Sequence, residues 1–265
     1  MAVRLVARSS KLIFVHNIAD NELMTRVLKA AGWTMIGLGV LIMLFLGYQL
    51  VGTNFLTARS QDQGQEAVEE HFVAAQDEIE VVDTLPPAQD DDNGSPEDPA
   101  PEDEPPIVHY SEPIPQEGLA FGVMTIPKID GEHVLFEGVD SATLKKGPGH
   151  MPWTPLPGQP GNAVVSGHRT TYGAPFFDLD QLEPGDEILV ETALGLHTYV
   201  VRSSFIVAPT AVEVTDPRRG AWLTLTTCNP RFSARERLII SAELVDGPNF
   251  AYALADKEFV PSEAS

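Results

Sequence analysis

The chain has 265 residues, of which 43% are hydrophobic, enough to form a globular core. Seventeen Lys and Arg against 38 Asp and Glu give a formal net charge of −21, which argues against a basic surface for sequence-independent binding to nucleic acid. A single Cys excludes an intramolecular disulfide framework and a metal site built from Cys alone.

The charges divide the chain into three parts. Residues 1–59 contain six Lys or Arg and two acidic residues, and residues 60–127 contain 18 acidic residues with neither Lys nor Arg. Residues 128–265 contain 11 basic and 18 acidic residues. The acidity therefore lies mostly in the middle part, and the three parts differ in kind.

The first predicted element is a membrane-spanning helix. No charged residue occurs from Ala30 to Ala58, and the stretch Trp33–Val51 is almost entirely apolar. At a helical rise of about 1.5 Å per residue this stretch reaches roughly 28 Å, close to the thickness of the hydrocarbon core of a bilayer. Basic residues precede it and an acidic segment follows it, so the positive-inside rule places the N-terminus in the cytoplasm.

This pattern predicts a cytoplasmic segment over residues 1–30, a transmembrane anchor in the cell membrane over residues 31–52, and an extracellular remainder. A cleaved signal peptide is the alternative. Roughly thirty residues precede the apolar run, which is long for a signal peptide, and the run exceeds a usual signal h-region. The sequence therefore favours an uncleaved, single-pass anchor.

An acidic, Pro-rich extracellular stalk is predicted over residues 53–117. Residues 61–82 have the composition of a short exposed helix, whereas Pro and acidic residues dominate residues 83–115. Such a segment cannot bury enough apolar surface to offset the conformational entropy of ordering, and Pro and charge repulsion keep it extended. Its acidic residues show no ordered spacing of calcium ligands, so no metal site is predicted there.

A compact all-β domain is predicted over residues 118–246, followed by a peripheral tail over residues 247–265. Short apolar runs rich in β-branched residues alternate with Gly, Pro and Asp, which is typical of a closed barrel or a sandwich. Two short helices are expected, at Ser141–Lys146 and Ala174–Leu182. The apolar runs are residues 121–129, 132–139, 162–168, 186–193, 197–208, 211–215, 221–228 and 237–245.

Three residues at the ends of these runs could form a site for acyl transfer. Cys228 follows an apolar, Thr-rich run, His168 follows another, and Arg237 opens the last one. A thiolate is a strong nucleophile, an imidazole can carry a proton to and from a leaving amine, and a fixed guanidinium can stabilise an oxyanion.

Each of these residues also has an ordinary interpretation. Most free Cys residues behave as small buried hydrophobes, and a His at a strand end is more often structural. Arg231 and Arg235 lie on the same predicted loop and compete with Arg237, and two of the three are expected to be solvated surface charges. The three residue types become more informative when the stretches around them are read together.

These stretches resemble the sortase family. Thr224–Cys228 (TLTTC) matches the sortase signature TLxTC, and Gly161–Arg169 (GNAVVSGHR) matches the stretch around the sortase catalytic His. Gly147–Asn162 resembles the segment that precedes that His. Cys228–Ile240 resembles the loop and final strand of class E sortases, a housekeeping type of high-GC Gram-positive bacteria. The resemblance covers roughly residues 118–246.

The resemblance implies a sortase-type eight-stranded β-barrel and a cysteine transpeptidase of the hydrolase type, with no cofactor. It implies Cys228 as the nucleophile that cleaves the Thr–Gly bond of an LPxTG-like sorting signal, and His168 as the general acid and base. Arg237 would orient the substrate and stabilise the oxyanion. Tyr172 and Thr227 become candidate substrate-binding residues. A Tyr after the catalytic His is associated in class E with LAxTG signals.

The partners implied are the sorting-signal peptide of secreted surface proteins and an amine acceptor, either a peptidoglycan precursor or a pilin lysine. Pilin-assembling class C enzymes usually carry an Asp-Pro-aromatic lid before the barrel and a second span after it, and this sequence shows neither motif. A cell-wall acceptor is therefore expected, with a pilin-polymerising sortase as the alternative.

Two further classes of protein compete with a sortase. In papain-like and NlpC-type enzymes the Cys precedes the His, the reverse of the order here, and the SHGC-like stretch of an L,D-transpeptidase is absent. The remaining alternative is a membrane-tethered barrel that binds peptide without catalysis. All three catalytic residue types are present, so the sequence favours an active enzyme.

Overall fold

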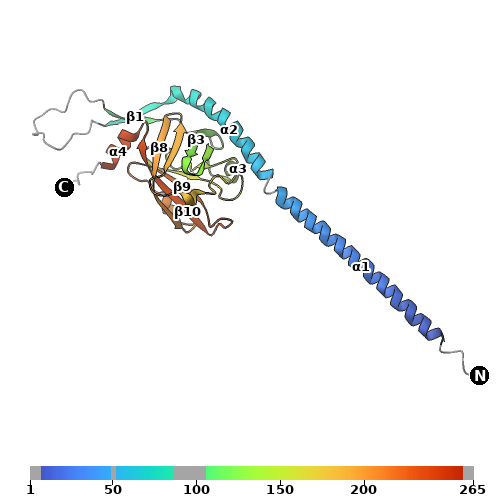
Figure 1. Cartoon of the computed structure of the whole chain (residues 1–265). Helices are drawn as coiled ribbons and strands as arrows, with labels where there is room; N and C mark the ends of the chain where they lie inside the picture. The colour runs from blue at the N-terminus through green and yellow to red at the C-terminus, as the bar shows by residue number, and fades with distance from the viewer. Residues whose placement is uncertain (1–6, 49–51, 86–105, 259–265) are drawn as a thin grey trace, which may run out of the picture. The chain divides into compact units, whose positions relative to one another are not determined.

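The computed structural model describes residues 7–48, 52–85 and 106–258 and divides into two compact units, residues 1–52 and 53–265 (Figure 1). The start of the predicted cytoplasmic segment, part of the predicted stalk and the end of the predicted tail fall outside the described residues.

The first unit contains one long helix, α1 (Ala7–Gly47). Within it, Met24–Gly47 is long and apolar enough to cross a membrane, and its apolar stretch is not buried in the protein. Its 24 residues would reach about 36 Å at ~1.5 Å per residue, more than the hydrocarbon thickness of about 30 Å. A helix that is apolar all round needs an apolar environment, so the predicted N-terminal apolar helix is confirmed as a candidate membrane span.

The second unit is built on a closed eight-stranded barrel, which confirms the predicted architecture (Figure 1). The strands follow one another around the barrel in the order β10-β8-β7-β3-β4-β5-β6-β9. Only the β4–β5 and β6–β9 pairs of this barrel are parallel. The strands are β3 (Ala120–Ile126), β4 (Gly131–Glu137), β5 (Gly149–His150), β6 (Gly161–Ser166), β7 (Glu187–Thr192), β8 (Gly195–Val207), β9 (Ala221–Asn229) and β10 (Glu236–Asp246).

One predicted strand was wrong, and one observed strand was missed. Residues 211–215 contain the 3-10 helix η5 (Val212–Thr215) instead of a strand. The reason is that Asn162 Nδ2 donates hydrogen bonds of 3.0 Å to the carbonyl oxygens of Val214 and Asp216, so a side chain satisfies these carbonyls in place of a neighbouring strand. The missed strand is β5, whose two residues are too few to show a periodic pattern.

Side-chain alternation along β9 and β10 separates the core from the outer face. Leu223 and Leu225 on β9, and Ile240 and Ala242 on β10, are completely buried in the main core cluster. Each fully buried Leu or Ile side chain of this kind contributes roughly 1.5–3 kcal/mol. The residues between them face outward, and on β9 this outer row ends at Cys228.

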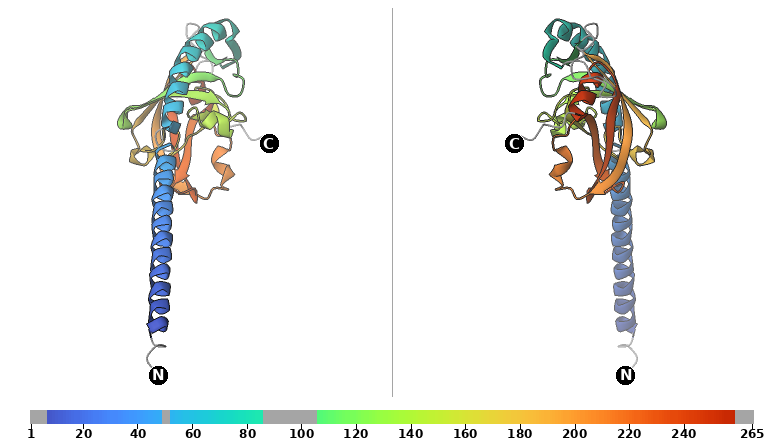
Figure 2. Two further views of the ribbon diagram at one scale, coloured as in Figure 1. Left: turned by 90° about the vertical axis from the view of Figure 1, so that its right-hand side faces the viewer. Right: turned by 90° about the vertical axis from the view of Figure 1, so that its left-hand side faces the viewer.

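The helix α2 (Thr53–Ala75) lies along the side of the barrel, against β3 and β4 (Figure 2). Its buried residues recur every three or four positions or multiples of this, as expected for one helix face. They are Thr57, Gly64, Val68 and Ala75. The sequence analysis expected a shorter, exposed helix; most of these buried residues are small or polar, so the buried face has no strong apolar signature.

The remaining elements connect and cover the barrel. The hairpin of β1 (Glu80–Leu85) and β2 (Ile107–Ser111) forms a separate two-stranded sheet. The helix α4 (Phe250–Glu258) contacts β2, β9 and β10 and lies in the predicted peripheral tail. The two expected short helices are present in shortened form. The short helices are η2 (Gln76–Glu78), η3 (Pro127–Ile129), α3 (Ser141–Leu144) and η4 (Leu179–Gln181).

Candidate active site

The register of three strands brings the predicted site residues to one end of the barrel. Cys228 is directly opposite Arg237 in the antiparallel β9–β10 pair, so both side chains project from the same face. On the other side of β9, the parallel strand β6 places Ser166 opposite Thr226. His168 lies two residues beyond Ser166 and Cys228 two residues beyond Thr226, so His168 emerges beside the end of β9.

One cavity of about 330 Å³ joins the thiol and the imidazole. His168–Thr171 line one side of it, and Cys228 and Phe232–Ala234 line the other. Cys228 is partly exposed and has no disulfide partner. The structure thus places a free thiol, an imidazole and open space for a substrate carbonyl together, which is the minimum that nucleophilic acyl transfer requires.

The surroundings of His168 favour its neutral form. The imidazole is partly buried, and the Tyr172 ring lies tilted beside it with the ring centroids 4.9 Å apart. Burial, and secondarily the positive charge of Lys145, lower the pKa of His168 below its ordinary value. A neutral imidazole can accept a proton from a thiol or from an attacking amine at neutral pH.

Arg237 is beside Cys228 in the ladder, but its guanidinium lies against the residues just before it in the chain. Its Nη1 donates hydrogen bonds of 3.0 Å to the carbonyl oxygens of Ala234 and Glu236. Arg237 is absent from the lining of the cavity that His168 and Cys228 share. A guanidinium has five N–H donors, so the bonds from Nη1 leave other donors for a substrate.

The two competing arginines occupy different positions. Arg235 lies on the exposed loop before β10. Arg231 forms ion pairs with Asp178 at 2.9 Å and Asp180 at 2.8 Å, and its guanidinium carbon lies 4.2 Å from the centroid of the Phe177 ring. Arg231 therefore ties the loop after Cys228 to the loop after His168.

Arg169 is a site residue that the sequence analysis did not single out. It is 3% exposed, and its guanidinium forms an ion pair with Asp180 at 3.0 Å. It also donates to the carbonyl oxygens of Phe177 at 3.1 Å and Cys228 at 3.4 Å. A buried cation with partners on two loops fixes the distance between the His168 and Cys228 segments. The Arg directly after His168 in the motif was the available signal, but its partners are remote in sequence.

Thr227 and Tyr172 lie in different surroundings. Thr227 is 2% exposed and its hydroxyl donates a hydrogen bond of 2.7 Å to the carbonyl oxygen of Gly167, so it joins the end of β9 to the end of β6. It does not line the cavity that Cys228 and His168 share. Tyr172 is partly exposed, and its ring contacts His168.

A second hollow lies on the outer face of β9 and β10. Thr224 and Cys228 share this face because they are four residues apart on one strand, a separation of about 13 Å at ~3.3 Å per residue. A cavity of about 370 Å³ is lined there by Thr224, Ile239 and Ser241, and by Phe205, Val214 and Arg218 on β8 and the β8–β9 connection. The face therefore offers a hollow within a few residues' reach of the thiol.

Within residues 7–48, 52–85 and 106–258, no group of three or more His, Cys, Asp or Glu side chains is arranged to hold a metal ion.

Comparison with known proteins places these features in a family. A family model described as the Sortase domain matches residues 124–245. Sortase SrtE1 of Streptomyces coelicolor is 31% identical over 82% of this chain and 57% of the relative. Sortase D of Bacillus subtilis is 35% identical over 44% of this chain and 58% of the relative. The chain thus spans less than two thirds of the length of these two relatives.

Two solved structures are similar to this chain over about half its length. Sortase E from Streptomyces avermitilis is 40% identical, with 49% of this chain and 91% of that chain covered and a TM-score of 0.46. Sortase E1 from Streptomyces coelicolor, solved with a tripeptide in the active site, is 34% identical. The match covers 49% of this chain and 90% of that chain, with a TM-score of 0.47.

Proposed function

We propose that this chain, a member of the sortase family of class E, is a membrane-anchored cysteine transpeptidase acting on an LPxTG-like sorting signal, expected to be LAxTG. The observation that carries the proposal is the single cavity lined by both Cys228 and His168. The two residues come from the ends of adjacent parallel strands, a position where a rigid scaffold presents side chains to a substrate.

In the first half of the reaction, His168 accepts the proton of the Cys228 thiol, and the resulting thiolate attacks the carbonyl carbon of the Thr residue in the signal. The tetrahedral intermediate collapses, the Thr–Gly bond breaks, and His168 donates a proton to the leaving amine of Gly. The Thr carbonyl is then held as a thioester on Cys228.

In the second half, an amine attacks the thioester and His168 accepts the proton that the amine loses. The new amide forms, the Cys228 thiolate leaves and takes the proton from His168, and the enzyme returns to its starting state with no net gain or loss of protons. The expected acceptor is a peptidoglycan-precursor amine, so the product is a surface protein linked to the cell wall.

Arg237 is proposed to orient the substrate and to stabilise the oxyanion. It projects from the same face as Cys228 and sits directly across the ladder from it. To reach the intermediate, the guanidinium must turn from the Ala234 and Glu236 carbonyl oxygens toward the substrate. A donor that binds the oxyanion more strongly than the ground-state carbonyl lowers the barrier.

The sorting signal is proposed to bind along the outer face of β9 and β10, with its apolar end in the hollow near Thr224 and Ile239. A separation of about 13 Å between Thr224 and Cys228 matches an extended peptide of four residues.

The proposed topology puts the N-terminus in the cytoplasm, the apolar helix across the membrane and the barrel of residues 118–246 outside as the catalytic domain. Basic residues before the apolar run support this orientation, because the cytoplasmic side of a span is enriched in Lys and Arg.

The test uses the full chain in detergent micelles with two fluorogenic peptides, one LAxTG and one LPxTG, each with and without an added amine. Mass spectrometry should detect cleavage between Thr and Gly and an amine-linked product. Both should be lost in the variants Cys228→Ala and His168→Ala, which should retain the wild-type circular dichroism spectrum. A folded wild-type protein that cleaves neither peptide, or activity that survives Cys228→Ala, would contradict the proposal.

A further inference from the structure

The turn that follows His168 has an unfavourable backbone conformation. Tyr172, Gly173 and Ala174 have positive φ angles of 51°, 76° and 48° in succession. Residues with a Cβ rarely adopt this region, and such a conformation persists only where the surrounding structure holds it. This turn also carries the aromatic ring that lies against His168, so whatever holds the turn also positions a neighbour of the imidazole.

The helix α2 contacts this turn through its first residues. Asn54 Oδ1 accepts a hydrogen bond of 3.0 Å from the backbone N–H of Gly173, the central residue of the turn. One helical turn later, Thr57 Oγ1 donates a hydrogen bond of 2.8 Å to the carbonyl oxygen of Lys145. The Lys145 ammonium lies 5.6 Å from the centroid of the Tyr172 ring. The first two turns of α2 therefore hold both segments that flank this ring.

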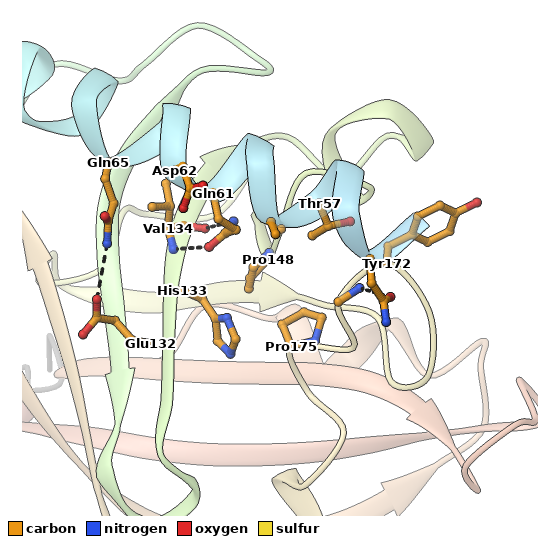
Figure 3. A pocket seen from close by; sticks show the side chains of 14 residues that line it. Thr57, Gln61, Asp62, Gln65, Glu132, His133, Val134, Pro148, Tyr172 and Pro175 are labelled. Atoms are coloured by element: carbon orange, nitrogen blue, oxygen red, sulfur yellow. Dashed lines mark hydrogen bonds between the residues drawn. The ribbon is translucent and has the colours of Figure 1, made fainter. Parts of the chain in front are cut away.

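The position of α2 on the barrel is itself fixed by Gln61 and Gly64. The Gln61 side chain accepts a hydrogen bond of 2.7 Å from the backbone N–H of Val134 and donates one of 3.3 Å to its carbonyl oxygen, so it binds both backbone groups of this β4 residue (Figure 3). It also donates a hydrogen bond of 2.9 Å to the carbonyl oxygen of Lys146. At Gly64, an added Cβ would lie 2.9 Å from Val134 Cγ1, too close for any larger residue without a shift. These contacts set the register of α2 and thus the reach of Asn54.

Packing between α2 and the turn is incomplete. A cavity of about 290 Å³ lies there, lined by Asn54, Gln61, His133 and Tyr172 among others (Figure 3). Because open space borders the turn on this side, a directional hydrogen bond contributes more to its conformation than close packing does. The Asn54 side chain supplies that bond.

We propose that α2 is a positioning element of the candidate active site and that Asn54 is a positioning residue, which holds the turn 172–174 and keeps the Tyr172 ring against His168. The inference rests on the proposed transpeptidase function. The helix begins at Thr53, immediately after the unit that contains the apolar helix. The segment next to the anchor is thus part of the machinery of the site, and removing it as a spacer would loosen the turn.

The test compares three variants of the full chain in detergent micelles. Asn54→Ala removes the acceptor, Asn54→Asp keeps an acceptor oxygen at the same place, and Gln63→Ala changes an exposed residue of the same helix. Hydrogen exchange at residues 172–174 and kcat/KM for the LAxTG and LPxTG peptides are measured on each. In Asn54→Ala we expect exchange to become about fivefold faster, the factor expected for one backbone-amide hydrogen bond.

Catalysis should respond in the same pattern. Asn54→Ala should lower kcat/KM for the LAxTG peptide about fivefold and bring it closer to the LPxTG value, because the Tyr172 ring is no longer held. Asn54→Asp and Gln63→Ala should stay within about twofold of wild type in both measurements, since neither removes the acceptor. Rescue by Asp separates positioning from a general loss of stability.

If the wild-type chain cleaves the peptides, two results would overturn the proposal. One is unchanged exchange at residues 172–174 in Asn54→Ala. The other is faster exchange with unchanged kcat/KM and unchanged discrimination between the peptides. If the wild-type chain cleaves neither peptide, the proposed function fails separately, and alkylation of Cys228 by iodoacetamide replaces the kinetic readout. If the alkylation rate of Cys228 differs from wild type in Asn54→Ala but not in Asn54→Asp, the result supports positioning by Asn54. Equal alkylation rates in wild type and Asn54→Ala would overturn the proposal.

Discussion

The two ends of the barrel each contain a histidine whose pKa is lowered by burial, yet only one of these ends has the features of an active site. The strand β10 connects them, from Arg237 at one end to Asp246 at the other. His168 is partly buried and shares a cavity with Cys228. His197 is completely buried, and burial lowers its pKa to about 4. A lowered pKa therefore does not by itself identify a catalytic histidine; access and a neighbouring nucleophile are also needed.

Backbone conformation separates the two ends as well. At the Cys228 end, Tyr172 and Phe232 both have positive φ angles, and Phe232 is 83% exposed. At the other end, Asn249 is completely buried and forms hydrogen bonds of 2.8 and 2.9 Å with the N–H and carbonyl oxygen of Tyr110 and 3.1 Å with the carbonyl oxygen of Gly158. Unfavourable backbone conformations thus lie beside the proposed site. At the opposite end of the barrel, called the closed end below, the Asn249 side chain forms hydrogen bonds with backbone groups.

The largest expected contrast comes from changing each histidine to Gln. His168→Gln should lower kcat/KM about a thousandfold with little loss of thermal stability, because it removes the proton carrier from an accessible cavity. His197→Gln should cost roughly 1–3 kcal/mol of stability and leave the activity of the folded protein intact, because it disrupts a buried hydrogen bond with Thr192. Peptide kinetics and thermal unfolding on both variants check this, and similar activity losses would remove the distinction between the two ends.

Arg237 and Arg235 offer the next contrast, within the site end itself. Arg237→Ala should lower kcat/KM about a hundredfold, the usual effect of removing one oxyanion donor, whereas Arg235→Ala should change it less than about twofold. The reason is that only Arg237 pairs with Cys228 across the ladder. The measurement is the same peptide assay at saturating and limiting substrate. A larger loss from Arg235→Ala would reassign the cation.

At the closed end, Glu112 should make stability depend on pH. It is 5% exposed, and burial raises its pKa to about 7, so the native state retains the proton to higher pH than the unfolded state does. Its contribution is fully present below the unfolded value of about 4.5 and is lost as pH rises through 7.

Glu112→Gln should remove this dependence. From pH 5 to pH 8 the wild type should lose about 2 kcal/mol more unfolding free energy than the variant. The unfolding free energies of both proteins, measured in the same detergent from pH 5 to pH 8, check the prediction. The titration of His197 contributes equally to both proteins and therefore cancels in the difference. Parallel stability curves would show that Glu112 does not titrate as its burial indicates.

The smallest effect concerns Tyr172, where the site end touches α2. Tyr172→Ala should reduce the preference for LAxTG over LPxTG by about threefold, because the ring contact beside His168 is lost, and Tyr172→Phe should keep most of it. Competition between the two peptides in one reaction measures the ratio directly. A preference that Tyr172→Ala leaves unchanged would place the source of selectivity elsewhere on the outer face.

The sequence by itself determined what depends on local periodicity and on residue type. An uncharged apolar run predicts a helix that can span a membrane, and short apolar runs separated by Gly and Pro predict the barrel. Cys228 and His168 were each expected at the end of such a run, and the structure brings both to one cavity. Arg237 was likewise expected to open the last strand, and the structure places it opposite Cys228.

Only the tertiary structure decided which remote segments meet. The buried face of α2 contains Thr57, Gly64 and Ala75, whose small or polar side chains give no apolar stripe, so its packing on the barrel depends on shape and on hydrogen bonds. Arg169 is a buried cation because Asp180 and several carbonyl oxygens from other segments surround it. Such contacts join residues far apart in the chain, and no local pattern encodes them.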